Sequence, residues 1–295
     1  MPCALRAFAG WMLSRTTASE GRKMSVLDLA LLAIVFFATS IVSVVTGATS
    51  LVTVPVMLSF GIDARTALAT NMLALTFLSA GAASTFWQSR EIHPADLRWP
   101  LVLTVVGSVA GALLVFAMPV DAIRTVVAVA MLALAGFVLR PPSRSVAKQL
   151  TPRPSSILGN VVTFVLAIYG GFFSGGYVTL LTVAWTKLFC MPFRQAVMGT
   201  KFANLLSSLA AVVIFSTQGI IDWQLGAVLS VAAFAGALLG AKWTLHMSEK
   251  WLRRVFAATV SVLAVKMLMV DVQWNALLGR LLLRCSPCLD GLQET

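Results

Sequence analysis

Charged side chains are scarce in this chain. They make up 11% of 295 residues, against roughly 25% in an average soluble domain. Acids are the rarest of them, with 11 Asp and Glu against 22 Lys and Arg, while apolar residues reach 59% and the mean hydropathy is +0.90. A soluble domain could not bury so much apolar side chain, because much of its surface faces water. The composition excludes a soluble enzyme and a disordered chain, and it predicts a polytopic membrane protein.

Cysteine and the common catalytic motifs are also in short supply. The 4 cysteines are too few for a disulfide framework, and Cys285 and Cys288 lack the second pair or nearby histidine of a zinc site. The sequence contains no HExxH, GxSxG or Walker pattern, and no paired carboxylates within its apolar runs. We therefore predict no catalytic residue, no metal site and no cofactor, and neither an embedded hydrolase nor an ATP-driven pump.

The basic excess has a topological explanation. A net charge of +11 suggests nucleic-acid binding in a soluble chain. Here most Lys and Arg lie between apolar runs, where cytoplasmic loops of membrane proteins favour them. No nucleic-acid partner is expected.

Charge-free runs predict the membrane spans, because about 20 apolar residues as a helix cross about 30 Å of hydrocarbon. The runs are Leu29–Ile62, Thr66–Ser89, Trp99–Val120, Thr125–Leu139, Pro154–Thr186, Phe202–Ile221, Trp223–Ala241 and Val255–Val265. Most runs fit one span each, with some extension past a flanking charge. The first and fifth are too long for one crossing, since straight helices of their length would measure roughly 50 Å.

Glycines interrupt both long runs. The first contains Gly47 followed by Pro55, and the second contains Gly170, Gly171, Gly175 and Gly176. Each run is interpreted as a full span, a break and a half-length helix that does not cross. Close helix packing is the alternative role for glycine, and it explains Gly107 and Gly111 better than it explains the excess length. Paired interrupted segments are typical of the binding site of a transporter.

The two broken runs belong to an internal repeat. From 47 to 86, 11 of 40 positions are identical to the residue 129 places later, where roughly 4 matches are expected by chance. The sequence predicts an all-α fold of two homologous four-span halves, 24–139 and 157–271, each with a Gly-broken half-helix after its first span. A basic, Pro-rich cytoplasmic linker (140–156) joins the two halves. A leader (1–23) precedes the first half, and we interpret it as sequence upstream of a true start at Met24. An amphipathic or disordered tail (272–295) follows the second half.

The relative orientation of the halves stays open. Four spans per half favour halves related in parallel, by an axis along the membrane normal. That arrangement leaves Lys250, Arg253 and Arg254 outside the cell, against the positive-inside rule. The alternative is that one half-helix crosses and the halves are inverted.

Polar residues gather around the two breaks and suggest an anion site. A broken helix exposes backbone N–H groups and a partial positive charge at the start of the half-helix, and hydroxyls and amides add neutral donors. We expect the candidate substrate-binding residues to converge near the midplane: Gly47, Thr49, Thr70, Asn71, Gly175, Gly176, Thr179, Thr200, Lys201 and Asn204.

Four basic residues in or near the predicted spans could serve either the substrate or the membrane interface. Lys201 either supplies positive charge to an anion, with proton coupling if it releases its proton, or extends to the membrane interface. Lys187 is expected at the interface, and Arg65 and Arg194 are interpreted as interfacial anchors.

Two stretches resemble the signature of the sulfite exporter TauE/SafE family, also called the toluene-sulfonate uptake permease family. They are "LVTVPVMLSFGIDARTALATNM" after the first break and "SGGYVTLLTVAWTKLFCMPFRQAVMGTKFAN" in the second half, followed by "GIIDWQLG" at 219–226. The resemblance covers about 24–271. The sequence departs from the pattern at Gly47-Ala48-Thr49, where more glycine is usual, and at Ala184, Trp185 and Lys187.

The resemblance implies a multi-pass protein of the bacterial inner membrane. The implied activity is secondary transport, by alternating access, of small anions such as sulfite, sulfonates or related organosulfur compounds. Two alternatives remain: an anion channel, and a non-transporting membrane assembly subunit. Substrate, direction, coupling ion and oligomeric state do not follow from the sequence.

Overall fold

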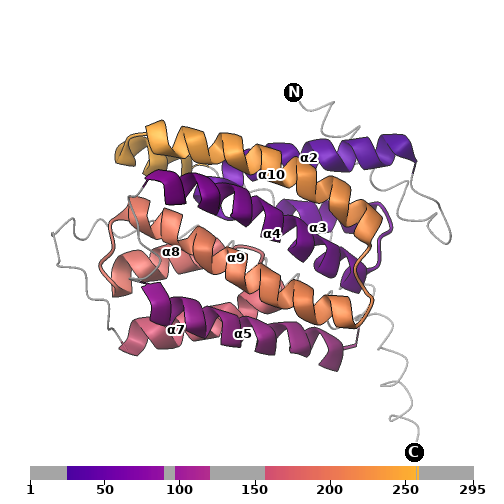
Figure 1. The fold of residues 1–295 in the computed structure, drawn as a ribbon, viewed down its shortest axis with the longest axis horizontal. Helices are drawn as coiled ribbons and strands as arrows, with labels where there is room; N and C mark the ends of the chain where they lie inside the picture. The colour runs from indigo at the N-terminus through magenta and orange to yellow at the C-terminus, as the bar shows by residue number, and fades with distance from the viewer. Residues whose placement is uncertain (1–24, 90–96, 120–156, 257, 259–295) are drawn as a thin grey trace, which may run out of the picture.

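The computed structural model describes residues 25–89, 97–119, 157–256 and 258, and these residues contain helices and no strand. Figure 1 shows the helices running along one long axis. The bounds are α2 (Val26–Thr46), α3 (Ser50–Ser59), α4 (Ala64–Ser89), α5 (Arg98–Ala117), α7 (Ile157–Phe172), α8 (Tyr177–Leu188), α9 (Phe193–Thr217) and α10 (Trp223–His246). Five of them (α2, α4, α5, α9 and α10) are long and apolar enough to cross a membrane. The chain is a multi-pass helical membrane protein.

Local sequence explains where several helices begin. Ser25 accepts a hydrogen bond from the backbone of Asp28, whose carboxylate accepts one in return, so a capping box starts α2. Asp222 accepts from the Leu225 N–H at the start of α10. Pro192, whose ring fixes φ, precedes α9.

Helix α9 extends past the charge-free run that marks its span. The run begins at Phe202 and the span is expected to begin near Gln195, and α9 begins at Phe193 and includes Arg194 and Lys201. A flanking charge does not end a helix when its side chain finds a partner, so the run marks only part of the span. The predicted spans Thr125–Leu139 and most of Val255–Val265, with the leader, linker and tail, lie outside the described residues.

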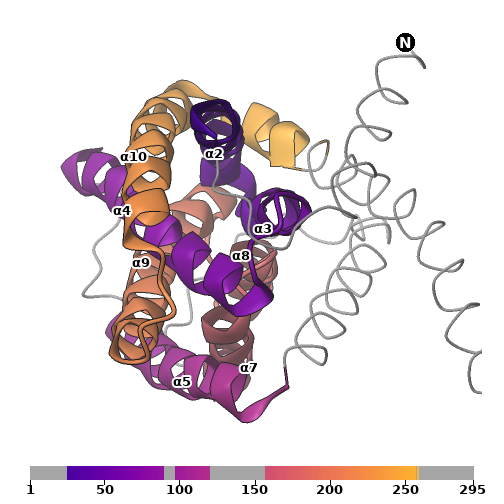
Figure 2. The same ribbon diagram turned by 90° about the vertical axis from the view of Figure 1, so that its right-hand side faces the viewer.

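Helices α2, α4 and α10 run in the same direction. Gly236 in α10 packs on Phe37 of α2, and Gly240 packs on Ile41. Thr70 and Leu73 of α4 contact Gly226, and Gly81 contacts Phe234, so residue numbers rise together along both pairs. Figure 2, seen along the helices, shows α10 beside both α2 and α4.

Helices α5, α7 and α9 form a second parallel group. Gly107 of α5 packs on Ala167 of α7, and Gly111 on Ile168. Ser108 hydrogen-bonds to Ser207 of α9, and the rings of Phe116 and Phe215 are in contact. This group is held by the same kind of close glycine packing as α10 on α2.

The two groups run in opposite directions. Helices α4 and α9 cross with residue numbers changing in opposite senses, since Ser79 contacts Asn204 while Trp87 contacts Phe202. We call the end of the bundle where α4 begins the Arg65 end, and the end where α9 begins the Arg194 end.

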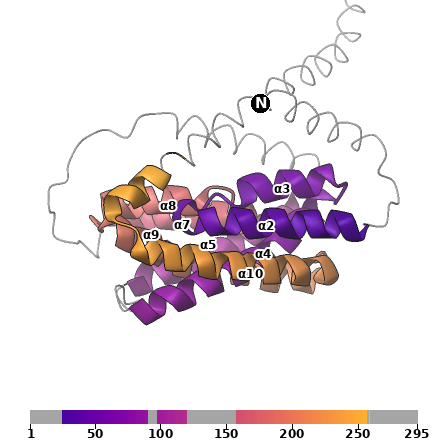
Figure 3. The same cartoon turned by 90° about the horizontal axis from the view of Figure 1, so that it is seen from above.

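Each broken segment is therefore a hairpin that returns to its starting end. Because α2 and α4 run the same way, α3 must lead back to the Arg65 end, and α8 likewise leads back to the Arg194 end. Figures 1 and 3 show α3 and α8 displaced toward opposite ends of the long axis. Helices that the repeat aligns thus point in opposite directions, and the expectation of halves related in parallel is wrong. The reason is the returning half-helix, which cancels the crossing of the helix before it.

Candidate functional site

The first break lies at the end of α2. Gly47 adopts the left-handed conformation (φ 69°), and its N–H donates to the Ser43 carbonyl at 2.7 Å. The Thr49 hydroxyl donates to the Ser43 hydroxyl, so Ser43 binds the chain on both sides of the break. Ser43, Gly47 and Thr49 are all buried. The irregular backbone is thus enclosed by protein, as the membrane interior requires.

The second break lies between α7 and α8. Ser174 (φ 60°) and Gly176 (φ 73°) both have left-handed backbones, and the Tyr169 hydroxyl donates to the Gly175 carbonyl. A Cβ on Gly175 would lie 2.2 Å from the Phe173 ring. Gly175 and Gly176 thus have local structural reasons to be glycine, beside the binding role predicted for them.

The two breaks contact each other across the bundle. A Cβ on Gly47 would lie 2.3 Å from the Val178 Cβ and 3.2 Å from the Thr179 nitrogen. The Thr179 hydroxyl donates to the Thr46 carbonyl. The end of α2, at the first break, therefore lies against the first turn of α8, and α3 and α8 lead away toward opposite ends of the bundle.

Neither half-helix is capped by a side chain at its start. Thr49 before α3 and Gly176 before α8 make no side-chain capping bond. The first N–H groups of a helix lack partners within it and carry partial positive charge. The Leu51 and Tyr177 N–H groups bond back to carbonyls of their own breaks. The N–H groups that remain at the two starts, buried at neighbouring breaks, suit the oxygens of an anion.

Lys201 brings a formal charge to this region. Its side chain is 1% exposed, and the Nζ donates to the Ser43 carbonyl at 2.7 Å. Within the described residues its side chain makes no ion pair with a carboxylate. Snorkelling to the interface is thus not what Lys201 does, because its ammonium points to the end of α2 beside the first break.

Asn204 links the second break to α4. Its amide nitrogen donates to the Ser79 hydroxyl at 2.6 Å, and its oxygen accepts from Ser174 at 3.3 Å. Ser79 was not among the predicted site residues. Its match with Ser208 in the repeat is the only sequence feature that singles it out.

Two further predicted residues, Asn71 and Thr200, hold the half-helices against the long helices that follow them. Asn71 donates to Ser50 at 2.9 Å and accepts from Thr53 at 2.7 Å, which fixes α3 on α4. At the positions 129 residues on, Thr182 and Thr200 lie 3.3 Å apart and join α8 to α9.

Thr70 lies in a different contact. Its hydroxyl accepts from the Asp222 N–H at 3.2 Å, at the start of α10 and at the Arg65 end of the bundle. The structure therefore brings Gly47, Thr49, Thr179 and Lys201 together directly. It does not bring Thr70 to them.

Asn71→Leu is expected to lower the free energy of unfolding by about 1–3 kcal/mol, because the Ser50 and Thr53 hydroxyls lose a buried partner. Adding Ser50→Ala should recover part of that loss, since it removes the hydroxyl that accepts from Asn71, whereas the Thr53 hydroxyl still has a backbone carbonyl as acceptor. The control is Thr76→Ala on the same helix, whose hydroxyl bonds only to the Met72 carbonyl of α4. Unfolding of the purified protein in mixed micelles of mild detergent and dodecyl sulfate measures all three. Equal stability of Asn71→Leu and wild type would contradict the assignment.

These features define a class: a multi-pass helical membrane protein with two returning broken helices that meet inside the bundle. The chain belongs to the sulfite exporter TauE/SafE family, whose model matches residues 31–267.

Curated relatives match nearly their full length. A protein of Haemophilus influenzae named "Probable membrane transporter protein" is 27% identical over 246 residues, covering 83% of this chain and 96% of its own. "Probable membrane transporter protein YfcA" of Escherichia coli K12 is 25% identical, covering 81% and 90%. "Probable membrane transporter protein ORF9" of a Sinorhizobium species is 24% identical, covering 81% and 92%. No solved structure matches the chain.

Proposed function

We propose that this protein is a secondary transporter that moves a small oxyanion, such as sulfite or a sulfonate, across the bacterial inner membrane by alternating access. The observation that carries the proposal is the contact between the first break, at Gly47, and the first turn of α8, at Val178, with the Lys201 ammonium beside the first break and no side-chain cap on either half-helix. The family and the names of the relatives support transport of this class. Helix starts, hydroxyls and one cation together suit a small, charged, oxygen-rich substrate.

Two homologous halves in inverted orientation are part of this proposal. Contacts recur 129 residues apart: Arg65 to Met118 and Arg194 to Met247, and likewise Thr53 to Asn71 and Thr182 to Thr200. Inverted repeats around paired broken helices are the architecture on which alternating access operates in several transporter folds. The channel alternative has no comparable support from the contacts described here.

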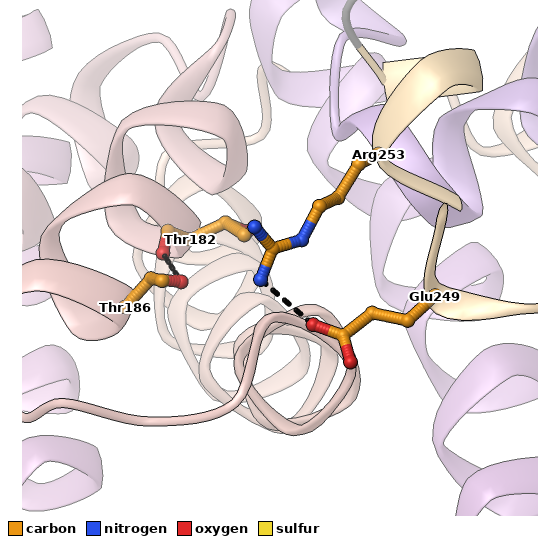
Figure 4. A network of polar contacts seen from close by, with 4 residues as sticks. All are labelled: Thr182, Thr186, Glu249 and Arg253. Carbon is orange, nitrogen blue, oxygen red and sulfur yellow. Dashed lines mark hydrogen bonds and ion pairs between the residues drawn. The ribbon is translucent and has the colours of Figure 1, made fainter. Parts of the chain in front are cut away.

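The charge distribution favours one orientation in the membrane. Among the described residues, the Arg65 end carries three acids and a single arginine, whereas the Arg194 end carries seven basic residues and Glu249, which pairs with Arg253 at 2.8 Å (Figure 4). The seven are Arg98, Lys187, Arg194, Lys242, Lys250, Arg253 and Arg254. By the positive-inside rule we place the Arg194 end in the cytoplasm. Lys250, Arg253 and Arg254 then obey the rule that parallel halves would have broken.

The test is uptake by proteoliposomes of labelled sulfite and of a sulfonate panel, with and without a pH gradient. A carrier gives saturable uptake that is accelerated by unlabelled substrate inside the vesicles. The pH-gradient arm reports on proton coupling. A large, unsaturable conductance would replace the carrier by a channel, and absence of any flux would favour an assembly subunit.

A further inference from the structure

The packed units of this protein are not its two sequence halves. Helix α10 packs on α2 and α4, while α5 packs on α7 and α9. We call α2, α3, α4 and α10 the first body, and α5, α7, α8 and α9 the second body (Figure 2). Each body has thus taken one helix from the other half of the chain, and the main contact between the bodies is the crossing of α4 and α9.

Two arginines bond across the boundary between the bodies. Arg65, in the first turn of α4, donates through Nη2 to the Met118 carbonyl just after α5, at 2.7 Å. Arg194, in the first turn of α9, donates to the Met247 carbonyl at 3.2 Å and to the Leu245 carbonyl at 2.7 Å, at the end of α10. Each guanidinium thus lies at the negative end of a helix that belongs to the other body.

The two arginines lie at opposite ends of the bundle. Arg65 is at the end where α4 begins and α5 finishes, and Arg194 is at the end where α9 begins and α10 finishes. An interfacial anchor directs its guanidinium to lipid headgroups. These side chains are half-buried and bond to backbone carbonyls instead, so the anchor interpretation does not describe them fully.

The geometry points to Arg65 and Arg194 as a pair of latches that position the two bodies and control which end of the bundle opens. The inference rests on the alternating access proposed above. Movement of one body against the other at the Arg65 end separates Arg65 from Met118, and movement at the Arg194 end separates Arg194 from α10. Both sets of bonds are made in this structure, as a state closed at both ends requires. Arg65 and Arg194 are positioning residues, because they act through helix ends and not on the substrate.

Thiol labelling of a buried reporter tests the latches without any substrate. In a variant with Cys3, Cys190, Cys285 and Cys288 replaced by serine, Ala48→Cys places a thiol beside the first break, where the side chain is buried. A membrane-impermeant maleimide is added to right-side-out vesicles, which expose the Arg65 end, and to inside-out vesicles, which expose the Arg194 end.

Arg65→Gln is expected to raise the labelling rate from the Arg65 end by about tenfold, the factor that one charge-assisted hydrogen bond contributes, and to lower it from the other end. Arg194→Gln should do the reverse, with a larger change because two bonds are lost. Arg254→Gln is the matched control at the same end of the bundle, since the described contact of Arg254 is with the Trp251 ring on the same segment, and both rates should stay unchanged.

Opposite shifts cannot arise from simple loosening of the fold, which would raise labelling from both ends. Parallel shifts in the two variants, or no shift in either, would overturn the latches. If the wild type takes up sulfur oxyanions but the arginine variants show no labelling shift, the latch proposal fails and the proposed function stands. If the variants show opposite labelling shifts but the wild type transports no anion, the proposed function fails and the latch proposal stands.

Discussion

Replacing Lys201 with methionine is expected to lower anion uptake by about a hundredfold while leaving the protein at least as stable as the wild type. Loss of one member of a buried, hydrogen-bonded charge pair costs about 2–5 kcal/mol of binding, which corresponds to this range. Stability should not fall, because the substitution removes a buried charge that has no carboxylate partner among the described residues. Methionine also stands at the aligned position of the first half, where Met72 is fully buried.

The two readouts together separate function from folding. Uptake is measured in proteoliposomes, and unfolding is measured in mixed micelles on the same preparation. Lys187→Met is the control, since that lysine is exposed at the end of α8, and its uptake should equal that of the wild type. Wild-type uptake by Lys201→Met would show that this ammonium does not serve the substrate.

Gly47→Ala is expected to lower the free energy of unfolding by about 3–5 kcal/mol, from a left-handed backbone that alanine disfavours and from overpacking of the break. The new Cβ would lie 2.3 Å from the Val178 Cβ and 2.5 Å from its Cγ1, far inside van der Waals contact. A loss of this size is a large share of the total stability of a typical domain.

Gly219→Ala is a matched control for the backbone contribution. Gly219 has nearly the same conformation (φ 66°) but nothing within 4 Å of a new Cβ, so its substitution should cost only about 1–2 kcal/mol. Adding Val178→Gly to Gly47→Ala removes both atoms of the clash and should restore part of the loss. If Gly47→Ala and Gly219→Ala cost the same, the breaks do not touch as described.

The positions of the two breaks could be predicted from sequence because glycine adopts backbone conformations that interrupt a helix, whereas Pro55 lies inside α3 and does not end it. Gly47 and Gly176, 129 residues apart, do adopt the left-handed backbone that only glycine takes readily. The grouping of polar residues near them rests on the same logic, since hydroxyls and amides in apolar helices need partners. Thr70 does not join this group, because neighbouring residues of a helix lie on different faces. Its hydroxyl faces α10, while Asn71 faces α3.

Helix direction could not be predicted in the same way. An apolar helix carries few charges to mark its two ends, so a returning half-helix and a crossing one have similar sequences. The exchange of α5 and α10 between the bodies depends on contacts far apart in the chain, such as Gly111 on Ile168 and Gly240 on Ile41. The partner of Lys201, the carbonyl of Ser43, is a backbone atom and leaves no trace in the sequence.

The most direct test of the central claim is to locate a bound anion. Crystals of the protein grown with selenite, the selenium analogue of sulfite, allow anomalous diffraction at the selenium edge to mark its position. We expect one strong peak within hydrogen-bond reach of the Lys201 Nζ and of the first turn of α3 or α8. A peak only on the lipid-facing surface or at the bundle ends, with the meeting point of the breaks empty, would contradict an anion site at that point.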